Sequence, residues 1–179
     1  MVGPTPLPPL VVHIIHELGT GGLENGLVNI INGSPPGRYR HAIVCLTTAG
    51  EFAKRITAPG VAVIELHKRP GHDLRLYWRV WKALRTLRPA IVHTRNLATL
   101  EMQFVAALLP RVKQVHGEYG RDVFDLYGAN RKYNLLRKAA RLVVRRYIAV
   151  SKDLERWLTE TVGVPPVKVR QIYNGVDQE

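Results

Sequence analysis

Residues 11–24 read VVHIIHELGTGGLE, an apolar run followed by a glycine-rich turn and an acidic residue. The β-branched run predicts a buried strand, and the pattern after the turn predicts a helix with Glu24 in its first turn. Such a turn gathers backbone N–H groups at the positive end of a helix, where anions bind well. We therefore expect an anion site here, with glycine supplying space and positive φ angles.

Two common nucleotide motifs do not fit this turn. The dinucleotide motif G-x-G-x-x-G requires a glycine where the chain has Glu24, and the Gly-Lys-Ser/Thr of the triphosphate loop is absent. The alternative interpretation is an ordinary tight turn in which Glu24 complements the helix dipole.

The rest of the chain repeats this alternation of strand and helix patterns. Short β-branched runs predict strands at Val11–Ile15, Ala42–Leu46, Val61–Leu66, Ala90–His93, Lys113–His116, Tyr147–Val150 and Val167–Tyr173. Helical patterns lie at Leu23–Asn32, Glu51–Ala58, Leu74–Leu84, Leu97–Leu109, Asn130–Val144 and Lys152–Thr161. Ser151 is expected to cap the last of these helices. The alternation predicts an α/β fold, a doubly wound parallel sheet of about seven strands with helices on both faces.

Length and composition fit one domain with a sizeable core, because the 179 residues are 46% hydrophobic. We assign residues 1–10 to a proline-rich tail and residues 11–177 to the domain. Residues 1–9 lack the features of a signal peptide, and no stretch approaches 18 apolar residues, so a cytoplasmic location is expected. Cys45, the only cysteine, lies in an apolar run and should be a buried thiol.

The net charge of +12 indicates an anionic partner surface. Residues 127–151 contain no acidic side chain. A helix over Asn130–Val144 would place on one face Lys138, Arg141 and Arg145, with Arg137 alongside. Its other face could pack through Leu135, Leu136, Ala139, Leu142 and Val143. The basic face is either a solvated surface or one that meets anionic lipid headgroups or nucleic acid.

In doubly wound sheets, ligands bind beyond the carboxyl ends of the strands. This edge would carry the glycine turn, residues 93–96, residues 116–122 and residues 151–152. The histidines expected at strand ends are His16, His93 and His116, of which His116 is the leading functional candidate. His13 is expected in the core, and so are Trp78 and Trp81. We expect loop positions for His41, His67 and His72, and no zinc site, because no pair has metal-ligand spacing.

Four segments together resemble the N-terminal half of family-4 glycosyltransferases, which have the GT-B fold. They are Gly21–Glu24, His116–Asp122, Ile148–Ser151 and Ile172–Asp177. The first two are most similar to bacterial exopolysaccharide sugar transferases. The resemblance covers Val11–Asp177 and implies a Rossmann-like, acceptor-side domain.

The resemblance implies retaining transfer of a sugar from a nucleotide-sugar donor to a lipid-linked or polysaccharide acceptor, without a metal or other cofactor. Gly21 and Gly22 match the loop that approaches the donor phosphate, and His116 matches the histidine near the donor sugar. Without a metal, backbone N–H groups and cations must stabilise the departing diphosphate. From position alone, we predict acceptor contacts by Arg95, Asn96 and Glu118.

The family places most donor contacts in a second domain after the stretch that corresponds to residues 174–177, and this chain ends at Glu179. We therefore expect an N-terminal half that is inactive alone. It would work peripherally at the cytoplasmic membrane face, toward which we orient Lys138, Arg141 and Arg145. Two alternatives remain: a non-catalytic Rossmann-like ligand-binding domain, and a basic nucleic-acid-binding module, whose motifs and interleaved aromatics are missing.

Overall fold

The computed structural model describes residues 7–121, 125 and 129–173. Within these residues, seven parallel strands form one sheet in the order β3-β2-β1-β4-β5-β6-β7. The strands are β1 (Leu10–Ile15), β2 (Arg40–Cys45), β3 (Ala62–Glu65), β4 (Ile91–Arg95), β5 (Lys113–Glu118), β6 (Arg146–Ala149) and β7 (Val169–Gln171). The predicted doubly wound parallel sheet is confirmed.

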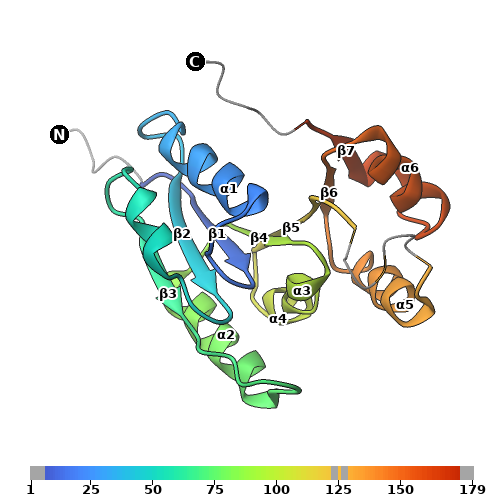
Figure 1. Cartoon of the computed structure of the whole chain (residues 1–179), viewed down its shortest axis with the longest axis horizontal. Coiled ribbons are helices and arrows are strands. Elements are labelled where there is room, and N and C mark those ends of the chain that lie inside the picture. The colour runs from blue at the N-terminus through green and yellow to red at the C-terminus, as the bar shows by residue number, and fades with distance from the viewer. Residues whose placement is uncertain (1–6, 122–124, 126–128, 174–179) are drawn as a thin grey trace.

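Helices connect the strands and cover both faces of the sheet (Figure 1). The α-helices are α1 (Gly22–Asn32), α2 (Leu74–Leu87), α3 (Leu97–Leu100), α4 (Met102–Ala107), α5 (Arg131–Ala140) and α6 (Lys152–Glu160). Two 3-10 helices are η1 (Glu51–Arg55) and η2 (Pro166–Lys168). The predicted cap of α6 is confirmed, because the Ser151 hydroxyl accepts a hydrogen bond from the Leu154 N–H at 3.1 Å.

The central strands are buried on both faces, as parallel strands between two helical layers must be. On β1, Val12 and Ile14 pack with α2 and α4, whereas Ile15 packs with α1 and η1. Alternation along the strand sends neighbouring side chains to opposite faces. Cys45 is a buried free thiol on the α1 side, as predicted.

The direction of the crossovers sets the position of a ligand site. From β1 the chain moves through β2 to β3, and it then returns past β1 to add β4, β5, β6 and β7 in sequence. Right-handed crossovers therefore put α1 and η1 on one face and the later helices on the other. The order reverses between β1 and β4, and ligands of such sheets bind at this switch point, outside the carboxyl ends of the strands.

The structure corrects two of the predicted helices. The pattern at 97–109 forms two short helices, α3 and α4, separated at Glu101. The helix predicted to end at Val144 ends at Ala140, because the chain must turn before β6 begins at Arg146. That turn leaves Leu142 81% exposed, so its predicted core position is wrong.

Two side chains lie on the side opposite to the predicted one. On α2, Leu76, Val80 and Leu84 form the buried stripe, and Trp78 points away from it with 59% of its surface exposed. Leu135 on α5 is 69% exposed. In both helices several apolar positions competed for the inward face, and packing selected only one stripe of them.

Candidate functional site

The glycine turn after β1 leads into a helix whose first amides have no side-chain cap. Gly21 is the N-cap residue of α1, and the first intrahelical bond runs from the Asn25 N–H to the Gly21 carbonyl at 2.9 Å. The N–H groups that precede this bond have no intrahelical partner, and such groups bind anions. Gly22, the first residue of the helix, is exposed.

The glycines of this turn are needed for space and not for backbone conformation. Gly21 is extended, with φ of −171°, and neither Gly19 nor Gly22 has a positive φ, so the expected left-handed geometry is wrong. A Cβ on Gly21 would overlap the Glu24 carboxylate, whereas a Cβ on Gly22 would point into open space.

Arg95 and Asn96 end the neighbouring strand β4. Asn96 has φ of 55° and ψ of 176°, a strained conformation for a residue with a side chain, and such strain is concentrated at functional sites. Its N–H donates to the Gly117 carbonyl at 2.8 Å, and its Oδ1 accepts from the Tyr119 N–H at 2.7 Å. Asn96 therefore fixes the backbone that follows β5.

Tyr119, which the sequence reasoning missed, completes a stack beneath the turn. The Arg95 guanidinium lies 4.6 Å above the centre of the Tyr119 ring. The ring in turn covers Gly117, where a Cβ would overlap it and would come within 3.1 Å of the His93 Nε2. A glycine two residues before a tyrosine, at a strand end, is the sequence signal for this close approach.

His116 lies on the opposite face of the sheet and is fully buried. Its Nδ1 is 2.8 Å from the Thr94 hydroxyl, which accepts a hydrogen bond from the Gln103 amide at 2.7 Å. Its Nε2 is 3.4 Å from Oε1 of Glu118. Because a carboxylate only accepts, we assign the Nε2 proton to His116, with the Thr94 hydroxyl donating to Nδ1.

Glu118 forms a buried ion pair with Arg137 of α5. The Arg137 Nε donates to Oε1 of Glu118 at 2.9 Å, and the two side chains are 2% and 1% exposed. Burial raises the pKa of Glu118, but the hydrogen bonds and charges of His116 and Arg137 together outweigh it and hold that pKa below its ordinary value. Acceptor binding by Glu118 stays a prediction; the observed feature is an interior ion pair.

Three further histidines form a buried row on the α1 side. His13 is in the core, as predicted, and its Nε2 is 3.1 Å from Nδ1 of His41. The prediction of a loop position for His41 is wrong, because this residue belongs to β2 and its Nε2 lies 3.0 Å from the Ser34 hydroxyl. His93 is beside His13. Burial lowers the pKa of all three. Within the described ranges, no His, Cys, Asp or Glu group is arranged to hold a metal ion.

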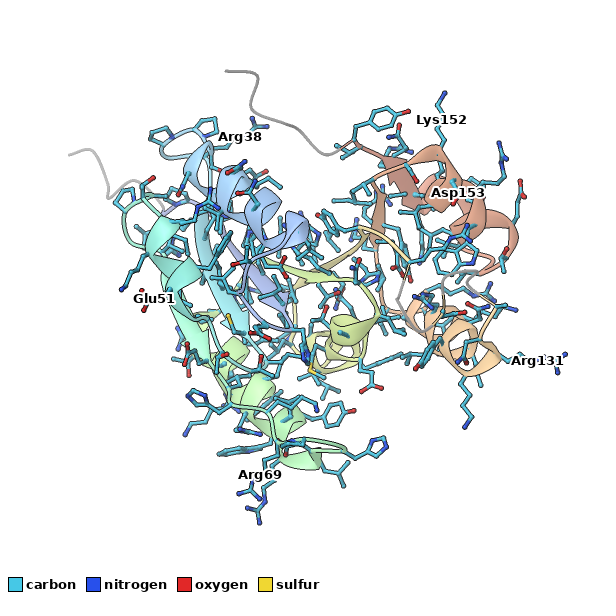
Figure 2. All side chains as sticks on the ribbon, in the orientation of Figure 1. Arg38, Glu51, Arg69, Arg131, Lys152 and Asp153 are labelled. Carbon is cyan, nitrogen blue, oxygen red and sulfur yellow. The ribbon has the colours of Figure 1, made fainter. Side chains whose placement is uncertain are left out.

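The predicted basic face is not one helical face. Lys138 is exposed on α5, Arg141 is the residue after its last turn, and Arg145 lies beyond the helix. Arg141 donates to the Gly163 carbonyl at 2.7 Å. Arg137, which was placed alongside, points into the interior instead. Figure 2 shows Arg131, at the outer end of α5, pointing away from the rest of the chain.

Comparison with known proteins identifies the family to which this sequence belongs. The sequence profile of glycosyltransferase family 4 matches residues 20–179, which is most of the chain. The chain belongs to glycosyltransferase family 4. No curated protein matches it.

Solved structures of GT-B glycosyltransferases share the fold of this family-4 domain. HepE from Anabaena, in complex with UDP and glucose, superposes with a TM-score of 0.69 at 17% identity, over 94% of this chain and 45% of HepE. A glycosyltransferase from Rickettsia africae gives 0.68 at 17% identity, over 95% of this chain and 44% of its own. The lipopolysaccharide outer core galactosyltransferase WaaB gives 0.66 at 13% identity, over 95% and 47%. The chain thus spans less than half the length of each of these proteins.

A structure of UDP-N-acetylglucosamine 2-epimerase from Rickettsia bellii also shares the fold, with a TM-score of 0.60 at 15% identity, over 93% of this chain and 45% of its own. At such identities the superpositions establish the fold alone.

Among the helices that the structure describes, none has the length and apolarity required to cross a membrane.

Proposed function

We propose that this family-4 domain is the acceptor-side half of a retaining glycosyltransferase, which moves a sugar from a nucleotide-sugar donor to a lipid-linked or polysaccharide acceptor. The observation that carries the proposal is the uncapped start of α1 at Gly21 and Gly22, located at the switch point of the sheet. HepE structures that contain UDP or UDP-glucose support a nucleotide donor.

The proposed roles follow from charge and position. The departing diphosphate gains negative charge, which the free amides of Gly21 and Gly22 would stabilise without a metal. Arg95 and Asn96 end the strand beside this turn and are proposed to contact the acceptor. His116 is proposed to act near the donor sugar. Because it is buried here, that role requires donor binding or a second domain to change its surroundings.

The test is a transfer assay on a protein in which this chain is joined to a family-4 donor-binding domain. We expect transfer from a radiolabelled nucleotide sugar, with NMR showing that the anomeric configuration is retained. Hydrolysis or epimerisation of the donor without transfer to any acceptor would contradict the proposal.

We expect the 179-residue chain itself to fold cooperatively and to transfer no sugar. The sheet has buried cores on both faces, so it should unfold in one thermal transition. The family's second domain supplies most donor contacts, and without them the transition state lacks stabilisation. Calorimetry and an assay with several nucleotide sugars check both points, and measurable transfer by this chain alone would refute the division of roles.

A peripheral position at the cytoplasmic membrane face is proposed for the basic residues at the end of α5. Lys138, Arg141 and Arg145 are exposed, and Leu135 and Leu142 are exposed among them. Basic residues attract anionic headgroups by about 1 kcal/mol each near the surface, and exposed leucines can enter the interface.

Replacing Lys138, Arg141 and Arg145 with glutamine should therefore weaken binding to phosphatidylserine vesicles at low salt, as measured by sedimentation. The thermal midpoint should change little, since the lost Arg141 bond to Gly163 is exposed. The matched control replaces Arg38, Arg69 and Arg75, exposed residues elsewhere on the chain, with glutamine. Equal binding by the triple variant and the parent would show that this cluster is only solvated.

A further inference from the structure

Arg95 is a buried arginine whose hydrogen-bond donors find no acceptor among the described residues. Its side chain belongs to a residue only 2% exposed, and within the described part of the chain none of its three nitrogens makes a hydrogen bond. Burial lowers the pKa of Arg95, and the interactions with Tyr119 and Glu24 offset this lowering only in part. Removing a charge from water without hydrogen-bond partners costs several kcal/mol. Burial of Arg95 should therefore destabilise the unliganded chain.

Arg95 lies close to the other unsatisfied donors of the site. Alternation along β4 sends Arg95 and His93 to the face that α1 covers, next to the end of β1. The amides of α1 begin there and have no side-chain cap. The guanidinium of Arg95 and the first N–H groups of α1 are thus two sets of hydrogen-bond donors at the same edge of the sheet.

Glu24 connects these two sets of donors. Its carboxylate reaches back to Gly21, at the start of α1, and its negative charge also attracts the Arg95 guanidinium. A carboxylate is itself an oxyanion and is favourable at this end of a helix. Glu24 therefore lies where an external anion would meet both the amides and the guanidinium.

Stacking on Tyr119 leaves the N–H groups of the Arg95 guanidinium without hydrogen-bond partners. The Tyr119 ring covers one face of the guanidinium plane, and the N–H groups at the edge of that plane can still donate. Such an edge binds a carboxylate or phosphate through two parallel hydrogen bonds. Asn96 and Gly117 hold the ring in place, so the platform is built before any ligand arrives.

Building on the proposed sugar transfer, we propose that Arg95 and the first amides of α1 bind an oxyanion of a substrate, and that Glu24 occupies this place in the unliganded chain. The oxyanion displaces the Glu24 carboxylate and supplies the hydrogen-bond acceptors that the Arg95 nitrogens lack. Two substrate groups have this chemistry: the diphosphate of the donor and an acid group on the acceptor sugar.

Binding to the 179-residue chain tests the proposal, with sodium diphosphate, sodium glucuronate and neutral glucose as probes in separate calorimetric titrations. We expect one anion to bind and glucose not to bind. Arg95→Met should weaken anion binding at least tenfold, and Glu24→Gln should strengthen it several-fold by removing the competing carboxylate. Arg75→Met, at an exposed arginine, is the control and should leave the affinity unchanged. Diphosphate binding assigns the site to the donor, and glucuronate binding assigns it to an acidic acceptor.

A second measurement separates ligand binding from a structural role. Methionine fills a similar space without a charge, so Arg95→Met should raise the thermal midpoint of the unliganded chain, as replacement of an uncompensated buried charge does. A structural arginine would give a lower midpoint.

If neither anion binds in a way that depends on Arg95, or if Glu24→Gln weakens binding, the proposal is overturned. These titrations involve no sugar transfer. Loss of anion binding in a protein that still transfers sugar would reject only the oxyanion site, and anion binding in a protein that never transfers sugar would reject only the transferase.

Discussion

Gly22→Val should lower the rate of sugar transfer by roughly 10²–10³-fold in a protein that joins this chain to a family-4 donor-binding domain, because loss of one such stabilising contact has an effect of this size. The open space around the Gly22 Cβ position is where the donor phosphate is proposed to approach the amides. Valine would fill that space and keep the phosphate away. The fold should survive, since the Cβ of a new side chain would meet no atom within 4 Å outside the adjoining backbone of α1.

The matched control is Gly26→Val, one turn further along α1. Its Cβ position is equally open, and valine has a similar helix propensity at either site, but Gly26 lies outside the first turn. We expect transfer by this variant to stay near the parent rate. Steady-state kinetics and circular dichroism on both variants make the comparison, and parental activity in a folded Gly22→Val protein would remove the phosphate role.

Arg137→Met should destabilise the chain by about 3–5 kcal/mol at neutral pH, because it leaves Glu118 buried as an uncompensated charge. The Arg137 side chain supplies the 2.9 Å bond to Glu118 and also lies 4.7 Å from the centre of the Trp157 ring. Arg137→Lys keeps the charge and should recover part of the loss. Lys138→Met changes the next, exposed residue of the same helix and should have little effect.

The pH dependence of this loss follows from the pKa of Glu118. In the parent that pKa is lowered, so the pair stabilises the fold above the ordinary carboxyl pKa and loses its effect as the pH falls through the lowered value. Without Arg137, burial should raise the pKa, and Glu118 would bind a proton on folding. The variant's deficit should therefore shrink as the pH falls from 7 toward 5, as urea unfolding at each pH can measure. A deficit that does not change with pH would mean that packing, and not charge, explains the loss.

Local patterns were sufficient to predict the sheet. Most strands contain a short run of apolar residues, and each intervening segment has either a helical stripe or a stop signal, so element types follow from residues close in the sequence. The Ser151 cap, the buried Cys45 and the core His13 were predicted for the same reason. The turn at Gly21 and Gly22 was placed at the strand end, although its glycines supply space and not positive φ.

The composition of the candidate site could be predicted only in part. Gly21 and Gly22 lie in the turn after β1, and Arg95 and Asn96 lie where β4 ends, and the order of the strands brings both segments to one edge. His116 was predicted at the end of its strand, but β5 continues to Glu118, and the face to which His116 points separates it from Arg95. Tyr119 was missed, since its contact joins a residue that follows β5 to Arg95, the last residue of β4.

The sequence by itself determined the strands, the helices and the edge at which substrates are proposed to bind, because the period of apolar residues is a local property of the chain. Only the tertiary structure decided which charges are compensated. Arg137 and Lys138 are adjacent on α5, yet one is buried against Glu118 and the other is exposed. Arg95 is buried without a hydrogen-bond partner among the described residues. Whether a buried charge finds a partner depends on which distant element packs against it, and no local pattern contains that information.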